Sequence, residues 1–246
     1  MEGKIKKQVK TIAHRHGNSL KSLDRTIANG SVDAVECDVY FTDGRFAVRH
    51  GRKYLPFFLF VIEKRNGKLR PIISFRELWL EEVLERVARS KKVLVIDLKR
   101  TYDEPDTTIL ATKLLGLLRE FGLTNRVIID SKSLTLLHAV YRVAKYHLRS
   151  PVPELRLSID NQQELEQLMD VYRTYYEKFL YGVTMNEKIL SSMEPDMFAD
   201  LKRSLQHISI FTINNSEDAE RFIDMGASAI CSDDLTLLEA LKTKEA

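Results

Sequence analysis

Seven polar side chains in the first half of the chain lie at or close to the ends of short apolar runs, and their types could do chemistry together. In chain order they are His14, Arg15, Glu36, Asp38, His50, Asp97 and Lys99. Carboxylates are the usual ligands of hard divalent cations, and imidazoles exchange protons near neutral pH. The cationic side chains of Arg15 and Lys99 can bind an anion. The set therefore predicts a cation-dependent site with acid and base groups beside it.

The three carboxylates carry the physical argument. Glu36 and Asp38 are two residues apart in a predicted strand, which puts both side chains on one face of it, and Asp97 lies in the apolar run VLVIDLK. Charges that point the same way from a buried strand are costly unless they are paired or bound to a metal ion. Ligation by oxygen alone favours Mg²⁺ or Ca²⁺ over zinc. We therefore expect one divalent cation, Mg²⁺ or Ca²⁺, held by these three residues.

Each of these residues also has a purely structural interpretation. A Glu-x-Asp pair in a strand is often a solvated edge, and a single histidine at the start of a loop is often structural. Asp97 and Lys99 could also form an ion pair with each other at a strand end. Co-occurrence favours the functional interpretation, because the candidate residues all fall at strand ends of the first three predicted units.

The elements that must position these side chains are short β-branched runs that alternate with helical patterns. The predicted strands cover 9–13, 34–40, 93–98, 126–130, 154–158, 179–184, 207–212 and 229–231, and the predicted helices lie near 19–29, 74–90, 106–121, 132–147, 161–177, 187–204, 216–225 and 234–243. Eight strand–helix units without a Pro-, Gly- or Ser-rich linker indicate one domain, residues 1–246, folded as a (β/α)8 TIM barrel with parallel strands. In such a barrel the loops after the strands build the site.

Four local features of the sequence add to this prediction. Residues 49–71 interrupt the second unit, and Asn66-Gly67 predicts a hairpin that forms an insertion or lid over one mouth of the barrel. Ser74 and Glu77 have the spacing of a capping box. Pro195 predicts a break in the sixth helical segment. The apolar run 54–60, beside basic residues, is interpreted as a hairpin strand packed on its own domain, with contact to lipid as the alternative.

Composition narrows the class of partner. The chain has 246 residues, 44% of them hydrophobic, and a formal net charge of only +3, with no basic stripe of the kind that binds nucleic acid. A small anionic substrate fits this balance. Cys37 and Cys231 form no CxxC pair, and no long apolar run follows the N-terminal lysines, so we expect a reduced, cytoplasmic setting. Nothing in the sequence indicates an oligomeric state.

The order of the polar residues resembles a known family. The segments TIAHR and VDAVECDVYFTDGRFAVRH, then ISFRELW, VLVIDLK and a closing FTINNSEDAERFIDMGASAICSD, are similar to glycerophosphodiester phosphodiesterases, within the superfamily of phosphatidylinositol-phospholipase-C-like phosphodiesterases. The resemblance covers both ends and much of the first half of the chain. It implies hydrolysis of a small phosphodiester to glycerol 3-phosphate and an alcohol. Its implied roles are a catalytic pair His14 and His50, metal ligands Glu36, Asp38 and Asp97, and phosphate-binding groups Arg15 and Lys99.

Departures from the family pattern leave alternatives open. The segment His16-Gly17-Asn18-Ser19 stands where the family usually has Gly and a Pro-Glu-Asn-Thr run, Asp97 replaces the usual Glu, and Gly51 replaces an Asp after His50. The family's Trp near the last strands is replaced by Phe211. His50-Gly51 and IDLK also resemble sphingomyelinase D-type phospholipases, which implies transfer to a cyclic phosphate as an alternative. A further alternative is a barrel that binds phosphoesters without turning them over.

Residues near the end of the chain have two interpretations. Asn214 and Ser232-Asp233 follow the last two predicted strands, where they could contact substrate. An N-cap of the last helix explains Asp233 equally well. Cys37, which lies between two of the proposed ligands, should face away from the site and belong to the core.

Overall fold

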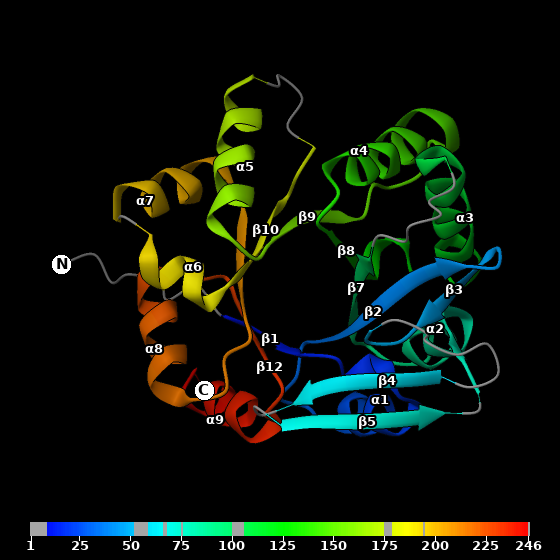
Figure 1. Cartoon of the computed structure of the whole chain (residues 1–246), viewed down its shortest axis with the longest axis horizontal. Helices are drawn as coiled ribbons and strands as arrows, with labels where there is room; N and C mark the ends of the chain where they lie inside the picture. The colour runs from blue at the N-terminus through cyan, green and yellow to red at the C-terminus, as the bar shows by residue number, and fades with distance from the viewer. Residues whose placement is uncertain are drawn as a thin grey trace.

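The computed structural model describes residues 9–51, 59–65, 68–74, 76–99, 106–174, 179–193 and 195–245. Within these residues, eight parallel strands close into a ring in the order β1, β12, β11, β10, β9, β8, β7 and β2, because β2 also pairs with β1 (Figure 1). Helices surround the ring. The (β/α)8 barrel predicted from the alternation of strands and helices is therefore confirmed.

The barrel strands begin and end within a few residues of their predicted positions. They are β1 (Lys10–Ala13), β2 (Ala34–Thr42), β7 (Val93–Lys99), β8 (Val127–Ser131), β9 (Glu154–Ile159), β10 (Gly182–Asn186), β11 (His207–Phe211) and β12 (Ala229–Ser232). Strands buried on both faces are continuous apolar runs, since one face packs inside the ring and the other under the helices. The positions of the barrel strands can therefore be predicted from the apolar runs in the sequence.

The helices also follow the apolar periodicity. They are α1 (Leu20–Ala28), α2 (Leu80–Ala88), α3 (Thr107–Glu120), α4 (Leu134–Arg142), α5 (Gln162–Thr174), α6 (Glu187–Ser192), α7 (Pro195–Ser204), α8 (Ser216–Met225) and α9 (Leu235–Glu245), with short helical turns η1 (His16–Asn18), η2 (Thr124–Arg126) and η3 (Val143–Leu148). The break predicted at Pro195 is confirmed, because α6 ends at Ser192 and α7 begins at that proline.

The predicted capping box is wrong. Ser74 ends strand β5 (Lys68–Ser74), and α2 begins six residues later, after the short strand β6 (Leu78–Trp79). The carboxylate of Glu82 accepts a hydrogen bond from the Trp79 backbone N–H at 3.2 Å, which caps the helix from inside. Glu77 instead forms an ion pair with Arg49, so a tertiary contact replaces the predicted local one.

The insertion after β2 contains the predicted hairpin. Strand β3 (Arg45–Val48) pairs with β2, and β4 (Leu59–Arg65) pairs antiparallel with β5 across a two-residue connection at positions 66–67. That connection and residues 52–58, with most of the apolar run proposed as a lipid-contacting lip, lie outside the described residues. A role of the hairpin as a lid stays a prediction.

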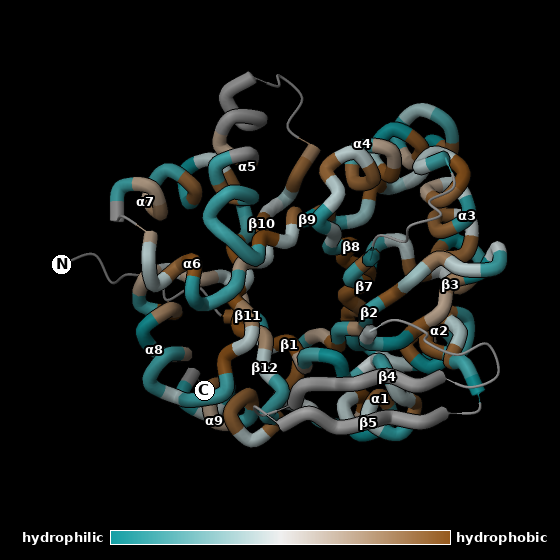
Figure 2. Tube along the Cα trace, in the orientation of Figure 1, coloured by the Kyte–Doolittle hydropathy of each residue, from teal (hydrophilic) through white to brown (hydrophobic). Residues whose placement is uncertain are grey.

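Three apolar clusters hold the described part of the barrel together. The largest lies between the strands and the helices, and the second fills the ring with Ile12, Ala34, Val95, Ile128, Ala229 and Cys231. The third packs α9 against the end of β1, with Ala13, Val32, Leu235 and Leu238. Figure 2 shows the corresponding brown stretches along the ring strands. Both cysteines are buried, and Cys37 belongs to the largest cluster, as predicted for a core residue. No helix in the described part of the chain is both long and hydrophobic enough for a membrane span.

Candidate active site

The seven candidate residues converge at one end of the barrel. His14 and Arg15 directly follow β1, Glu36 and Asp38 lie in β2, and Asp97 and Lys99 end β7. Parallel register places Asp38 beside Asp97. Because strand alternation turns every second side chain inward, these groups share the barrel interior at its C-terminal end.

The three carboxylates form one acidic cluster. Glu36, Asp38 and Asp97 each offer an oxygen, and these oxygens all lie within 4.8 Å of one another. Glu36 and Asp38 are only 5% and 1% exposed. Burial, reinforced by the neighbouring carboxylates, holds the pKa of Glu36 well above its usual range. Burial likewise raises the pKa of Asp97 to about 6.

This acidic cluster fits a hard divalent cation. Oδ1 of Asp97 is buried and has no hydrogen-bond partner among the described residues. The donors are all oxygens, and they come from rigid strands. A cation bound between the three carboxylates would offset their mutual repulsion and so lower the raised pKa values of Glu36 and Asp97. Glu36, Asp38 and Asp97 are therefore the residues that could hold Mg²⁺ or Ca²⁺.

Lys99 and Arg15 lie on either side of the acidic cluster. Nζ of Lys99 is 2.8 Å from Oδ1 of Asp38 and also contacts Asp97, so the ion pair considered from the sequence does form. Burial lowers the pKa of Lys99, but the carboxylates raise it by more, so the net shift is upward. Nε of Arg15 is 3.7 Å from Asp38. Burial raises the pKa of Asp38, yet the nearby cations, led by Lys99, hold it below its usual value.

Local backbone geometry fixes the carboxylates. The Arg15 backbone N–H donates to Glu36 Oε2 at 2.6 Å, and Asn18 exchanges two hydrogen bonds with Asp38. The turn η1, which carries Asn18, lies so close to β2 that a Cβ on Gly17 would be 2.6 Å from Cβ of Cys37. Only glycine permits that approach. Cys37 is buried against this turn, as expected for a core residue.

His14 is oriented by an acidic residue from the opposite end of the sequence. Its Nδ1 lies 2.9 Å from Oδ1 of Asp233. A carboxylate only accepts, so Nδ1 carries the proton and Nε2 is left to exchange one. Asn214 accepts the Asp233 backbone N–H at 3.0 Å and supports the loop. The N-cap role considered for Asp233 belongs to Asp234 instead, which accepts from Thr236.

His50 follows β3 and is half-buried. Its Nδ1 is buried and has no hydrogen-bond partner within the described residues. Burial lowers the pKa of His50 to about 4, with the nearby charges of Arg15, Lys99 and His14 acting in the same direction and Asp38 opposing them. His50 is therefore neutral at pH 7, and both histidines belong to the same electrostatic environment.

A buried arginine, Arg49, connects the end of β3 to β2. The Arg49 backbone N–H donates to the Asp38 carbonyl at 3.0 Å, and its guanidinium pairs with Glu77 and lies 4.9 Å from the Tyr40 ring centroid. This interaction holds the β3 end against β2, and so it positions the adjacent His50. No local pattern in the sequence predicts this interaction, because Arg49 and Glu77 are far apart along the chain.

Comparison with known proteins identifies the fold. No family model matches the sequence, and no curated protein matches it. A glycerophosphodiester phosphodiesterase from Parabacteroides distasonis is 21% identical, covers 98% of this chain and 100% of its own, and has a TM-score of 0.68. An Oleispira antarctica phosphodiesterase in complex with its product sn-glycerol-3-phosphate is 16% identical, covers 94% and 96%, and has a TM-score of 0.65.

A third solved structure agrees with these two. The glycerophosphodiester phosphodiesterase from Thermotoga maritima is 17% identical, covers 97% of this chain and 98% of its own, and has a TM-score of 0.66. The likeness extends over nearly the whole chain in all three cases, at an identity that shows the fold. Two of these three solved structures carry the name of the family that the sequence resembles, and the third is a phosphodiesterase in complex with sn-glycerol-3-phosphate.

Proposed function

We propose that this chain is a phosphoric diester hydrolase that cleaves a glycerophosphodiester to glycerol 3-phosphate and an alcohol with the help of a divalent cation. The observation that carries the proposal is the convergence of Glu36, Asp38 and Asp97 with two histidines at the C-terminal end of the barrel. The fold shared with glycerophosphodiester phosphodiesterases supports the class of substrate.

The cationic side chains are assigned to the phosphate. A diester carries negative charge on its non-bridging oxygens, and its cleavage is fastest when that charge is met by groups already in place. Arg15 and Lys99 flank the acidic cluster and can donate to those oxygens. Bound by the three carboxylates, the divalent cation would add Lewis-acid polarisation of a phosphoryl oxygen.

The two histidines are assigned to proton transfer. His50, neutral at pH 7 because burial lowers its pKa to about 4, can accept the proton of the attacking hydroxyl. His14, whose Nδ1–H donates to Asp233, is favoured as the protonated partner that gives a proton to the leaving alkoxide. The attacking hydroxyl belongs either to water or to the substrate, and the second case gives a cyclic phosphate.

The test is an assay of purified protein on glycerophosphocholine and on lysophosphatidylcholine, each with Mg²⁺, Ca²⁺ or EDTA. Release of choline and glycerol 3-phosphate from the first substrate with a cation, and none with EDTA, is the expected result. Turnover of lysophosphatidylcholine alone, with a cyclic product detected by ³¹P NMR, would replace the proposal by sphingomyelinase D-type transfer. Turnover of neither substrate with either ion would leave a barrel that only binds phosphoesters.

A further inference from the structure

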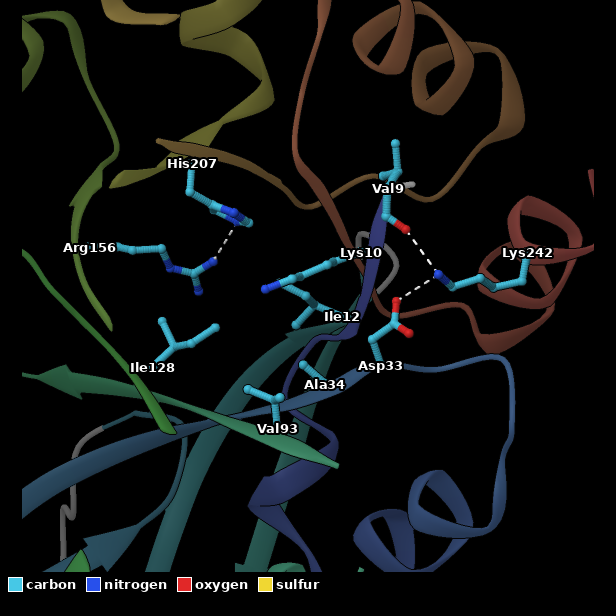
Figure 3. Close-up of a pocket in the computed structure, with 10 residues that line it drawn as sticks. All are labelled: Val9, Lys10, Ile12, Asp33, Ala34, Val93, Ile128, Arg156, His207 and Lys242. Atoms are coloured by element: carbon cyan, nitrogen blue, oxygen red, sulfur yellow. Dashed lines mark hydrogen bonds and ion pairs between the residues drawn. The ribbon is translucent and has the colours of Figure 1, made fainter. Parts of the chain in front are cut away.

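A cavity with several charged side chains in its lining lies at the end of the barrel opposite to the acidic cluster. It has a volume of about 240 Å³ and is lined near the starts of six ring strands, β1, β2, β7, β8, β9 and β11 (Figure 3). Its polar lining comes from Lys10, Asp33, Arg156, His207 and Lys242, and its apolar lining from Val9, Ile12, Ala34, Val93 and Ile128. A cavity of about 150 Å³ already admits benzene, so this one has room for a small organic molecule.

The guanidinium of Arg156 enters this cavity although it is only 1% exposed. Its Nε and Nη2 donate to both oxygens of Asp130, at 2.6 and 2.8 Å, and its Nη1 lies 3.2 Å from Nε2 of His207. An arginine has five N–H donors, so two of them have no acceptor among the described residues. A buried donor without an acceptor is costly, which indicates that something else in the cavity accepts from it.

Lys10 adds a second positive charge to the same space. Figure 3 shows its amino group pointing into the cavity on the side of Arg156. Lys10 makes no ion pair or side-chain hydrogen bond with any part of the chain that the structure describes, whereas Lys242 is held by Asp33 at 2.9 Å. Lys10 and Arg156 thus face one cavity, and neither forms an ion pair with another residue of its lining that the structure describes.

The charges around the cavity select the ligand. Asp130 neutralises Arg156 and Asp33 neutralises Lys242, which leaves the charge of Lys10 unmatched in the lining. Glu154, on the same side of β9 as Arg156, does not line the cavity and forms no ion pair within the described ranges. One unmatched positive charge beside an apolar wall fits a monoanion with a hydrocarbon part better than a phosphate dianion.

We propose that the N-terminal end of the barrel is a binding site for a short aliphatic monocarboxylate. Its carboxylate lies between Lys10 and Arg156 and accepts their free N–H donors, and its chain of about four to eight carbons packs on Ile12, Ala34, Val93 and Ile128. This site is separate from the acidic cluster, which lies at the other end of the same strands.

Isothermal titration calorimetry with hexanoate as the probe tests the site in the intact chain without any substrate. Hexanoate should bind with a stoichiometry of one, and hexanol, which has the same chain without the charge, at least about tenfold more weakly. Lys10→Met should weaken hexanoate binding by about tenfold or more. Lys91→Met is the matched control, because Lys91 lies at the same end of the barrel but lines a neighbouring hollow.

A second variant tests the size of the cavity separately from its charge. Ile128→Phe narrows the cavity without changing its charge and should also weaken binding, with circular dichroism confirming the fold. A crystal soaked in hexanoate should show the carboxylate against Lys10 and Arg156. The site is excluded if hexanoate does not bind, if hexanol binds as tightly, or if Lys10→Met and Lys91→Met have the same affinity. Phosphodiester turnover should not change in Lys10→Met, so failure here leaves the proposed function untouched.

Discussion

Asp97 and Asp130 are neighbours in the barrel, yet their surroundings differ. They lie opposite each other in the parallel register of β7 and β8, and both point into the ring. Asp130 is 3% exposed and accepts from Arg156 with both oxygens and from Thr184 at 2.9 Å. Asp97 contacts Lys99 through one oxygen, and its other oxygen is buried without a partner among the described residues.

The difference shows how one barrel interior supports two kinds of buried charge. Around Asp130 the chain supplies a complete set of donors, so the carboxylate is satisfied and serves the fold. Around Asp97 the chain supplies two more carboxylates and one lysine, so the negative charge of the three carboxylates exceeds the positive charge of the lysine. An excess of that kind is relieved by protonation or by a bound cation. The contrast therefore separates Asp130, whose partners the chain supplies, from Asp97, a candidate ligand of the proposed cation.

The largest effect is expected at the histidines of the site. His14→Ala and His50→Ala should each lower kcat by about 10²- to 10⁴-fold, because each removes a proton-transfer group, while the free energy of unfolding changes little. Rate measurements with glycerophosphocholine and urea unfolding check both parts. His138→Ala, on α4 and away from the site, is the control. Near-normal rates in either site variant would remove the two-histidine mechanism.

The next largest effect concerns Asp130. Arg156→Met leaves Asp130 buried without its counter-ion and should lower the free energy of unfolding by about 3–5 kcal/mol. Asp97→Asn should not destabilise the cation-free protein, because it removes a repelled charge. Chemical denaturation of both variants in EDTA gives the comparison directly. Equal losses of stability in Arg156→Met and Asp97→Asn would show that Asp130 and Asp97 both stabilise the fold.

How far the sequence predicts these two environments depends on the range of the interactions. Strand and helix positions follow from local apolar patterning, and the acidic cluster follows from a two-residue spacing repeated at strand ends. The contacts that complete each environment join distant positions, as Arg156 joins Asp130 and Asp233 joins His14. No local pattern marks such pairs. The wrong prediction for Glu77 has the same cause, since its partner Arg49 lies 28 residues earlier in the chain, directly after β3.

Ligand substitutions sharpen the comparison at the acidic cluster. Glu36→Gln keeps the shape of the side chain but removes a charge, so the cation concentration needed for half-maximal activity should rise about tenfold or more. Titration of activity with Mg²⁺ and with Ca²⁺ measures the shift. Glu154→Gln, a carboxylate of the barrel outside the acidic cluster, is the matched control. Unchanged metal dependence in Glu36→Gln would count against that ligand.

A smaller effect is expected at the residue that orients His14. Asp233→Asn keeps a group that can contact Nδ1 but removes the negative charge, so kcat should fall by about tenfold. Burial raises the pKa of Asp233, but its hydrogen bond to His14 and the positive charges of His14 and Arg15 together lower it by more, so the carboxylate is ionised throughout the neutral range. Losing it should shift the alkaline limb of the rate–pH profile to lower pH. A profile that keeps its shape would mean that Asp233 acts only on the loop.

The smallest effect is thermal and depends on pH. The pKa of Asp97, about 6 in the folded chain, exceeds its ordinary value of 3.8, and that of Glu36 is raised as well. Between about pH 4 and pH 6 the folded, cation-free chain therefore binds more protons than the unfolded chain, and its stability falls as the pH rises. A cation that binds the ionised carboxylates should restore this loss. The rise in Tm on adding Mg²⁺ or Ca²⁺ should thus be a few degrees larger at pH 7.5 than at pH 5, at about 2–4 °C for each kcal/mol.

This pH dependence contrasts the two aspartates in a single experiment. Asp97→Asn removes one of the raised groups, so its cation-induced rise in Tm should be smaller and should vary less with pH. Thr184→Val, which removes a donor from Asp130, should lower Tm at both pH values and leave the cation effect intact, because that carboxylate belongs to the fold. A cation effect of equal size at pH 5 and pH 7.5 would mean that ions bind elsewhere, and that Asp97 is held as firmly by the chain as Asp130.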